Sequence, residues 1–299
     1  MAERLDEIAV QSALSTGWLG RSYHYRPTIG STNDRLKEMA AASDGEELPA
    51  GTVLLANFQS HGRGRLNRRW QVPAGTSLLF SVLFRPNWPA DRANWLIMAT
   101  GVAAVEAVIA ESGLMAGLKW PNDLMVDVAG EWRKAGGLLL EGNLSADGRL
   151  ESAILGIGIN VNVPAEQLPE ATVAATSLLV AGGRPVSRLA LLVTLLERLE
   201  AHYEAADRGQ SPQVAWLQHL ITLGQAVQVT NAVSGQTLRG IAEGTDDSGH
   251  LLLRDEREEL HRVSAGDVTL RPATNAVAQD RQAIKDCSLV NRIFDICRE

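Results

Sequence analysis

The stretch VLLANFQSHGRGRLNRRW, residues 53–70, joins two patterns that together decide how this chain is built. An apolar run directly after Gly51 predicts a buried strand over residues 53–59. A second apolar run, LLFSVLF at 78–84, predicts the next strand. The segment between the strands is therefore a loop, and it carries four arginines: Arg63, Arg65, Arg68 and Arg69. Such a loop either is solvated or holds a ligand with several negative charges.

The composition limits the classes of protein to consider. The chain has 299 residues, of which 45% are hydrophobic and 21% charged, which is typical of a globular protein with one large domain or two unequal ones. Lysine plus arginine number 28 and aspartate plus glutamate 35, so the formal net charge is −7. This charge argues against a broad basic surface for duplex nucleic acid, and the arginine cluster is a local feature.

Cysteine usage and hydropathy predict the compartment. Cys287 and Cys297 are too few and too near the end of the chain to build a disulfide core or a zinc site, which indicates a reducing environment. The N-terminal sequence MAERLDEIAVQSAL has charges among its apolar positions, and no run approaches the roughly 18 consecutive apolar residues of a membrane span. We therefore expect a cytoplasmic protein without a membrane partner.

Hydrophobic periodicity predicts a mixture of helices and strands over most of the chain. A short helix is expected within residues 1–20, another over DRLKEMAAA at 34–42, and a longer one over 95–113 that ends at Gly113. The alternating run ILGIGINVNV at 154–163 predicts a strand with one buried face. A stripe of leucines that ends at Tyr203 predicts a long amphipathic helix.

After about residue 222 the pattern changes to short strands separated by turns. Five segments, AVQVT, LRGIA, HLLLR, ELHRV and DVTLR, alternate with turn signals such as DDSG at 246. This spacing is typical of a small antiparallel barrel. The sequence therefore predicts an α+β protein: a segment over 1–20, a large domain with a mixed sheet and helices over 21–221, a β-barrel over 222–272, and a tail over 273–299.

The arginine loop has the composition of an anion-binding segment, although common nucleotide motifs are missing. No G-x-x-x-x-G-K-[ST] occurs, and the G-x-G starts at 62 and 156 lack the third glycine of the dinucleotide fingerprint. Gly62 and Gly64 permit close approach of the backbone to a ligand. Arg63 and Arg65 can neutralise phosphate or carboxylate oxygens, and Trp70 offers a face for stacking a base. A solvated loop with a buried tryptophan is the alternative.

A second polar segment lies where two further strands are predicted to begin. KWPNDLMV, at 119–126, places Lys119, Asn122 and Asp123 at a proline turn before an apolar strand. RKAGGLLLEG, at 133–142, places Lys134 before a glycine turn into another strand. Two lysines and an aspartate at one edge of neighbouring strands can form a polar site. A lysine before a glycine turn is more often a solvated hairpin residue, so the coincidence with the arginine loop carries the interpretation.

Five segments resemble, in order and spacing, the motif set of the biotin protein ligases, also called biotin–acetyl-CoA-carboxylase ligases: STN at 31–33, QSHGRGRLNRRW at 59–70, KWPNDLMV at 119–126, RKAGGLLLEG at 133–142 and GIGINVN at 156–162. The resemblance extends from about residue 20 to 272 and implies a biotin/lipoate ligase-like catalytic domain followed by an SH3-like β-barrel. It implies a reaction in two steps. Biotin and MgATP give biotinyl-5′-AMP and pyrophosphate, and a carrier lysine then attacks the adenylate to form an amide.

The resemblance also implies roles for individual residues. The implied catalytic residues are Lys134, Arg63 and Asp123. The implied biotin-binding residues are Ser31, Thr32, Asn33, Gln59, Arg63, Gly64, Arg65, Lys134 and Gly137. The implied nucleotide-binding residues are Arg63, Arg65, Arg68, Trp70, Lys119, Asn122 and Asn160. Cations suit this chemistry, because the carboxylate and the α-phosphate that must join are both anionic.

The implied cofactors are ATP with Mg²⁺ as a substrate complex, with no metal site built from side chains. The implied partners are biotin, ATP and the biotin carboxyl carrier domain of a biotin-dependent carboxylase, with no DNA, and the protein is expected to be a monomer or a homodimer. A lipoate or octanoate ligase would share the fold and the adenylation, but the GRGR and KWPND segments favour biotin. A biotin-sensing repressor is disfavoured, because the residues before STN are too few for a winged-helix domain.

Three features depart from the motif set. Asn67 stands where the family commonly has glycine, although asparagine tolerates a positive φ better than most residues. His61 replaces a small residue before GRGR, and the tail follows residue 272. The first two features bear on how the loop becomes ordered, and no function is predicted for the tail.

Overall fold

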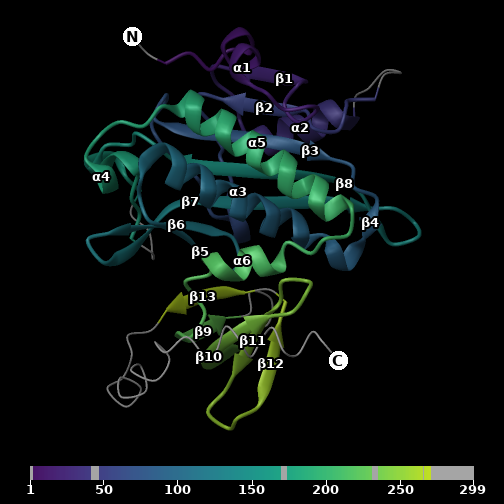
Figure 1. Cartoon of the computed structure of the whole chain (residues 1–299), viewed down its shortest axis with the longest axis vertical. Coiled ribbons are helices and arrows are strands. Elements are labelled where there is room, and N and C mark those ends of the chain that lie inside the picture. Colours follow the sequence, from purple (N-terminus) through teal and green to yellow (C-terminus); the bar gives the residue numbers. More distant parts are fainter. Residues whose placement is uncertain (1–2, 42–46, 170–173, 231–234, 265, 271–299) are drawn as a thin grey trace.

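The computed structural model describes residues 3–41, 47–169, 174–230, 235–264 and 266–270 of the chain. A large sheet with helices is formed by the purple to green part of the chain in Figure 1, and a smaller sheet by the yellow-green part that follows it. The predicted tail, residues 273–299, lies outside the described residues.

The large sheet has eight strands among the described residues. They are β1 (Tyr23–Arg26), β2 (Val53–Ala56), β3 (Ser77–Phe84), β4 (Trp88–Pro89), β5 (Ala116–Lys119), β6 (Asp123–Val128), β7 (Glu131–Leu144) and β8 (Arg149–Asn160). Their order is β1-β2-β3-β8-β7-β6-β5, and β4 also pairs with β8. β1 and β2 are parallel, and the other pairings are antiparallel. The two strands predicted on either side of the arginine loop are β2 and β3, and the structure shows that they are neighbours in a mixed sheet.

Helices cover both faces of this sheet. They are α1 (Glu7–Ala13), α2 (Thr32–Ala41), α3 (Asn94–Ser112), α4 (Leu178–Gly182), α5 (Arg188–Asp207) and α6 (Gln213–His219), with short 3₁₀ turns η1 (Arg65–Asn67), η2 (Ala90–Arg92) and η3 (Ala165–Gln167). α3 and α5 lie side by side in front of the strands, whereas α2 packs on β3 and β8 (Figure 1). The predicted end of α3 is confirmed, since Gly113 caps it with a left-handed φ of 73°.

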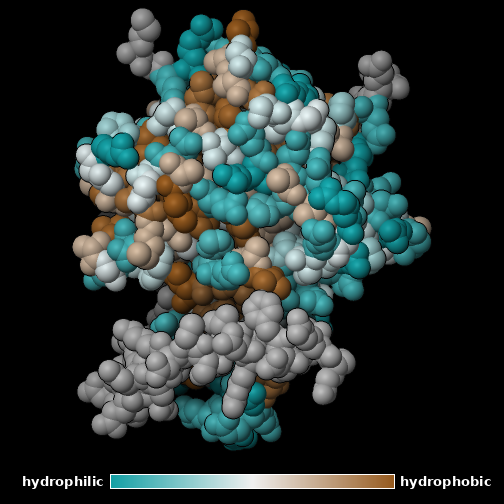
Figure 2. Space-filling model, viewed as in Figure 1, coloured by the Kyte–Doolittle hydropathy of each residue, from teal (hydrophilic) through white to brown (hydrophobic). Residues whose placement is uncertain are grey.

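Two of the helices show how the core face of the sheet is covered. Figure 2 shows mostly hydrophilic side chains over the outer side of α5, as expected for an amphipathic helix whose leucines are buried. The segment Ala90–Ser112, which contains α3, is the one stretch of the described residues long and apolar enough to cross a membrane by length and composition. α3 contributes many of its side chains to the main hydrophobic core, so packing within the fold accounts for its apolar character.

The central strands have a core face and a second, more open face. Leu78, Phe80 and Val82 of β3 belong to the main core with α3 and α5. Because side chains alternate along a strand, their neighbours point to the other face. There the central strands carry mostly small or polar residues: Ser77, Leu79, Ser81, Gly137, Gly156, Gly158 and Asn160. The second face therefore has room for a ligand.

The smaller sheet consists of the five strands that the sequence predicts. They are β9 (Ala226–Thr230), β10 (Thr237–Thr245), β11 (Leu251–Arg254), β12 (Leu260–Val263) and β13 (Asp267–Leu270), in the order β12-β11-β10-β9-β13. A closed barrel is not formed by the pairings among the described residues. β12 and β13 remain at the two edges, because each of these short strands pairs with one neighbour.

A turn of the smaller sheet docks onto the large domain. Side-chain N–H groups of Asn94, Trp95 and Trp120 donate to the backbone carbonyls of residues 247–249 at 2.8–2.9 Å. Trp120 belongs to the KWPND segment, and its indole is buried. The smaller sheet is therefore attached directly beside that segment.

Two local predictions were wrong. The strand predicted over 154–163 is β8, but it ends at Asn160. Gly136 and Gly137, predicted to form a turn, lie inside the continuous strand β7. A Cβ on Gly136 would lie 2.8 Å from the carbonyl oxygen of Gly158 on β8. The glycine is thus needed for close approach of two strands and not for a turn.

The N-terminal segment packs onto the large domain. Leu5, Val10 and Leu14 belong to the main core. The Glu200 carboxylate of α5 accepts the backbone N–H groups of residues 17, 18 and 19 at 2.7–2.9 Å. Burial acts to raise the pKa of Glu200, but these hydrogen bonds and the charge of Arg21 hold it below its usual value of 4.5. The segment is thus bonded to α5 through a charged acceptor.

Replacing Glu200 tests this attachment. We expect Glu200→Gln to lower the free energy of unfolding by about 1–2 kcal/mol at neutral pH, because an amide oxygen accepts weaker hydrogen bonds than a carboxylate. Since folding lowers the pKa, the wild-type advantage is complete above the usual value of 4.5 and is lost as the pH falls through the folded pKa. Urea unfolding at several pH values measures the difference in the free energy of unfolding between wild type and Glu200→Gln. A difference that persists undiminished in acid would contradict the assignment. Glu197→Gln is the matched control, because Glu197 contacts Ser15 in the same region.

Candidate active site

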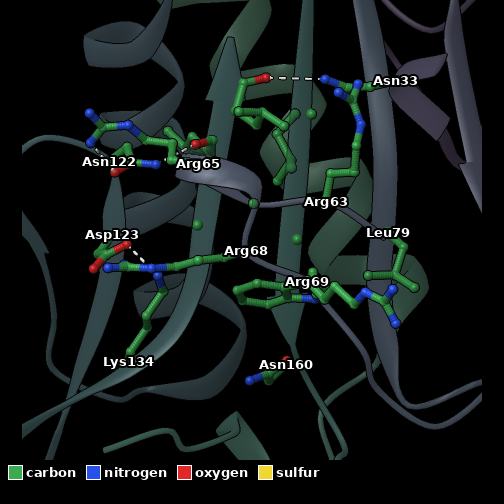
Figure 3. Close-up of a pocket in the computed structure, with 18 of the residues that line it drawn as sticks. Asn33, Arg63, Arg65, Arg68, Arg69, Leu79, Asn122, Asp123, Lys134 and Asn160 are labelled. Carbon is green, nitrogen blue, oxygen red and sulfur yellow. Dashed lines mark hydrogen bonds and ion pairs between the residues drawn. The ribbon is translucent and has the colours of Figure 1, made fainter. Parts of the chain in front are cut away.

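A cavity of about 630 Å³ lies on the second face of the large sheet, between the central strands and the arginine loop (Figure 3). Its volume is in the range of small-molecule sites. It is lined by all the residues to which the sequence assigns a ligand: Ser31, Thr32, Asn33, Gln59, Arg63, Gly64, Arg65, Arg68, Trp70, Lys119, Asn122, Asp123, Lys134, Gly137 and Asn160. The fold thus brings the five motifs around one space, and the individual roles stay predictions.

Buried short polar side chains form one end of the cavity. Gln59 Oε1 accepts hydrogen bonds from the backbone N–H of Thr32 at 2.7 Å and from its hydroxyl at 3.1 Å. Ser81 Oγ lies 2.7 Å from the Thr32 hydroxyl and donates to Asn33 Oδ1 at 2.6 Å. Ser31 is also buried. Paired groups of this kind hold one another in place and can present donors and acceptors to a buried polar ring.

Two glycines of β8 form the floor of the cavity. A Cβ on Gly156 would lie 2.3 Å from Asn33 Oδ1, which is closer than any side chain could tolerate. A Cβ on Gly158 would lie 3.1 Å from the indole of Trp70. Asn33 and Trp70 therefore rest directly on the backbone of β8. A Cβ at position 156 would force Asn33 to shift, and a Cβ at position 158 would require Trp70 to move by a few tenths of an ångström.

The side chains of the arginine loop diverge over the cavity (Figure 3). Arg65 donates to Asn122 Oδ1 at 3.2 Å, and Asn122 donates in turn to a backbone carbonyl of β7 at 2.5 Å. Arg68 points toward Asp123 and Lys134. The loop is thus connected to the KWPND segment on one side of the cavity.

The backbone of the loop is tightly folded. A Cβ on Gly62 would lie 2.2 Å from the carbonyl oxygen of Trp70, so the two ends of the loop meet in a place that only glycine fits. Leu66 adopts the left-handed conformation, with a φ of 55°, and is exposed. For a leucine this conformation costs roughly 1–3 kcal/mol, and such strain is frequent at functional loops. The residue with a positive φ is thus Leu66 and not its neighbour Asn67, which stands where the family commonly has glycine.

Lys134 and Asp123 form an ion pair at the side of the cavity. Lys134 Nζ lies 2.5 Å from Asp123 Oδ1 and 5.7 Å from the ring centre of Trp70. Lys119 stands opposite Asp123 in the sheet register and is buried. The predicted cluster of two lysines and an aspartate is present, and Lys134 is not the solvated hairpin residue of the alternative interpretation, because its side chain is only 25% exposed.

Trp70 and Asn160 form the other end of the cavity. Trp70 Nε1 and Asn160 Oδ1 are buried and have no hydrogen-bond partner among the described residues. Asn160 is held in place by its amide nitrogen, which donates to the carbonyl of Thr176 at 3.0 Å. Because buried polar atoms are nearly always paired, these two atoms indicate a polar ligand atom or an ordered water here.

The electrostatics of the cavity favour an anionic ligand. Among the described residues that line it, the cations are Arg63, Arg65, Arg68, Arg69, Lys119 and Lys134, and the carboxylate is Asp123. The chain as a whole has a net charge of −7, so the positive charge is concentrated at this place. Leu79 and Val268 add apolar surface beside it.

Some residues of the site were not predicted from the sequence. Val268, from β13 of the smaller sheet, lines the cavity, and no motif points to it. Ser81 and Glu141 bond to Asn33 without lining the cavity. Glu141 could have been found, because it stands two and four residues after Leu139 and Gly137 in a quoted motif, on the same face of a strand.

Comparisons with known proteins identify the family of the chain. The model of the biotin/lipoate A/B protein ligase family matches residues 26–160, and that of the biotin protein ligase C-terminal domain matches residues 222–271. The biotin–[acetyl-CoA-carboxylase] ligase of Mycobacterium tuberculosis is 35% identical over 88% of this chain and 95% of that protein. The bifunctional ligase/repressor BirA of Bacillus spizizenii is 31% identical over 89% of this chain and 79% of that protein.

The fold is also similar to that of solved structures. The biotin protein ligase of Aquifex aeolicus in complex with biotin and ATP superposes with a TM-score of 0.67, at 26% identity, over 85% of this chain and all of that one. A mutant of the same Aquifex aeolicus protein, in complex with biotin, superposes with a TM-score of 0.68 over the same shares of the two chains. The agreement of sequence and fold shows that this chain belongs to the biotin/lipoate A/B protein ligase family and is one of its biotin protein ligases.

Proposed function

We propose that this ATP-dependent biotin protein ligase carries out both of its half-reactions in the cavity on the second face of the sheet. In the first, a biotin carboxylate oxygen attacks the α-phosphorus of ATP, and pyrophosphate leaves. In the second, the amine of a carrier lysine attacks the acyl carbon of biotinyl-5′-AMP, an amide forms and AMP leaves. The observation that carries the proposal is that all five motifs line one cationic cavity.

The biotin ring is proposed to bind at the polar end. Its ureido group needs donors and acceptors in a buried place, and the cluster of Ser31, Thr32, Asn33 and Gln59 offers both. A ligand at this end would extend along the glycine floor, with its carboxylate toward Arg65 and Lys134. The backbone of the loop at Gly64 and of β7 at Gly137 can approach it closely, because neither has a side chain.

The nucleotide is proposed to bind at the end formed by Trp70 and Asn160. The indole provides a flat face for adenine, and the unpaired Asn160 Oδ1 is available to an amino group of the base. Arg68, Lys119 and Asn122 also line the cavity and suit the phosphates. Biotin and ATP then meet near the ion pair of β6 and β7.

Lys134 is proposed to act in the first step. The carboxylate and the α-phosphate repel each other, and a cation fixed between them lowers the barrier by stabilising the negative charge of the transition state. Lys134 is held by Asp123 and by the Trp70 ring, so it needs little reorganisation. Asp123 is proposed to take a proton from the incoming lysine in the second step, because an amine with a free pKa of about 10.4 is protonated at neutral pH.

Magnesium is proposed to enter as part of the MgATP substrate. Among the described residues that line the cavity, Asp123 is the carboxylate, and Asn122 adds an amide oxygen. Mg²⁺ bound to phosphates commonly takes only one or two protein ligands and keeps several waters. This set of donors fits an ion carried by the nucleotide, whose role would be to neutralise phosphate charge.

The remaining expectations concern partners and compartment. The proposed acceptor is a carrier domain of a biotin-dependent carboxylase, as the name of the Mycobacterium tuberculosis relative indicates for that protein. We propose a cytoplasmic protein without a DNA or membrane partner, acting as a monomer or a homodimer. The net charge of −7 and the low cysteine content support this part of the proposal.

Exchange of labelled pyrophosphate into ATP tests the first half-reaction. We expect exchange with biotin and little with lipoate or octanoate, because neither of these has a ureido ring to pair with the polar end of the cavity. Transfer of label to a carrier domain then tests the second half-reaction. Exchange that depends on lipoate instead of biotin would refute the proposed substrate.

The two floor glycines separate the proposed biotin and nucleotide ends. We expect Gly156→Ala to raise the KM for biotin at least about tenfold, because its Cβ would displace Asn33, and to change the KM for ATP little. Gly158→Ala should do the reverse, since its Cβ would press on Trp70. Steady-state kinetics of both variants measures the split. Equal effects on both substrates would show that the two ends are wrongly assigned.

The two lysines are distinguished by rate and stability. We expect Lys134→Ala to slow adenylate formation by roughly 100- to 1000-fold while it keeps its fold, as is common when one charged donor is removed from a transition state. Lys119→Ala should lower the melting temperature more relative to its effect on rate, because Lys119 is buried beside Trp120. Lys134→Arg should restore the rate only in part. If Lys134→Ala forms adenylate at the wild-type rate in single-turnover experiments, the assignment fails.

A further inference from the structure

The side chain of Arg63 is directed away from the other arginines of its loop. Its guanidinium lies beside Asn33, whereas Arg68 points toward Lys134 (Figure 3). Arg63 Nη2 lies 2.5 Å from Asp34 Oδ1 and 2.7 Å from Glu141 Oε2. One guanidinium thus meets two carboxylates, from α2 and β7.

Glu141 connects the loop with the polar end of the cavity. The same carboxylate accepts hydrogen bonds from Asn33 at 2.8 Å and from Lys37 at 2.5 Å. Burial acts to raise the pKa of Glu141, but the bonds from Lys37 and Asn33 and the charges of Lys37 and Arg63 hold it below its usual value of 4.5. At neutral pH it is therefore an anion that can attract the loop.

The two carboxylates lie outside the cavity, although Glu141 bonds to Asn33 of its polar end. Neither Asp34 nor Glu141 is among the described residues that line the cavity. They are bonded to Arg63 from α2 and β7, which form part of the scaffold on the second face. The Arg63 guanidinium is thereby occupied, so its position is explained by these carboxylates without any contact to a ligand.

We propose that Asp34 and Glu141 are positioning residues that hold the arginine loop closed over the cavity through Arg63. The inference rests on the proposed function, because the purpose of closure is to retain the activated biotin until the carrier arrives. A loop that stays down both holds a reactive acyl-adenylate and keeps water from it. A loop that is released lets the adenylate diffuse away and acylate any lysine.

Leakage of adenylate is the readout that tests the anchor. Asp34→Asn and Glu141→Gln keep the shape of each side chain and remove its charge, and the double variant removes both partners of Arg63. We expect the double variant to label a bystander protein about tenfold more than wild type per carrier labelled, in line with the loss of charge-assisted hydrogen bonds. Biotin-dependent pyrophosphate exchange should change much less, because neither residue lines the cavity and the amide oxygen of Glu141→Gln can still accept the hydrogen bond from Asn33.

Two control variants and a mutant cycle between Arg63 and its two carboxylates separate anchoring from a general structural effect. Glu38→Gln removes another charge from α2. In the described contacts the Glu38 carboxylate pairs only with Arg35, at 3.0 Å, so this variant should not leak adenylate. Lys37→Met removes a partner of Glu141 that does not belong to the loop, and it should leak little. Arg63→Ala should leak as much as the double variant, and combining all three changes should add nothing. Higher salt should increase leakage from wild type but not from the double variant, since the pairs are partly exposed and therefore screened.

The outcomes distinguish this inference from the function on which it rests. Strong leakage from the double variant, none from the controls and no additivity with Arg63→Ala support the anchor. If wild type and variants alike exchange pyrophosphate with biotin, but the double variant leaks no more than wild type, the anchor is refuted and the function stands. If Glu141→Gln does not fold, the single variant Asp34→Asn, whose wild-type side chain is 48% exposed, is the test. It should leak more than wild type but less than Arg63→Ala, because Glu141 still holds Arg63, and leakage no higher than that of wild type would refute the role of Asp34. If wild type shows no biotin-dependent exchange, the proposed function fails and the anchor fails with it.

Discussion

The site depends on the bare backbone of β8 at Gly156 and Gly158. These positions face away from the main core, near the centre of the mixed sheet, where a Cβ would press on Asn33 or on Trp70. Because neither glycine has a Cβ, Asn33 of α2 and Trp70 of the loop can contact the backbone of the strand, one at each end of the cavity. The distance between the two ends of the cavity is therefore set by a rigid sheet, as preorganised binding requires. The strand sets the positions of the two ends of the cavity, and the loops form the rest of its wall.

Charge is distributed unevenly over this framework. The chain is acidic overall, yet the cavity gathers four arginines and two lysines around Asp123. Such a concentration attracts an anionic substrate and would repel the loop from itself unless some of its charge were neutralised. Asp34 and Glu141 supply that neutralisation for Arg63, outside the cavity, so that the remaining cations can serve the ligand. The strained conformation of Leu66 at the tip is tolerated in the same loop because its two ends are fixed at Gly62 and Trp70.

The smaller sheet contributes to the wall of the cavity and is hydrogen-bonded to the large domain. Its turn over residues 247–249 accepts hydrogen bonds from three side chains, one of which is Trp120 in the KWPND segment. Its last strand contributes Val268 to the cavity wall. The position of the smaller sheet is thus coupled to that segment, which also bears Asn122 and Asp123.

The sequence by itself determined the alternation of helices and strands, the five short strands after residue 222, and the motif residues that line the cavity. Periodicity and turn residues are local properties, and the motifs carry the family resemblance, so both could be read without a structure. Only the tertiary structure decided that Gly136 and Gly137 lie inside a strand, that the smaller sheet keeps two edges, and that Arg63 turns to Glu141. Each of these depends on which backbone lies opposite, and strand pairing joins residues far apart in the chain. Local pattern does not encode that register, because the same short sequence can pair with different neighbours at a similar free energy.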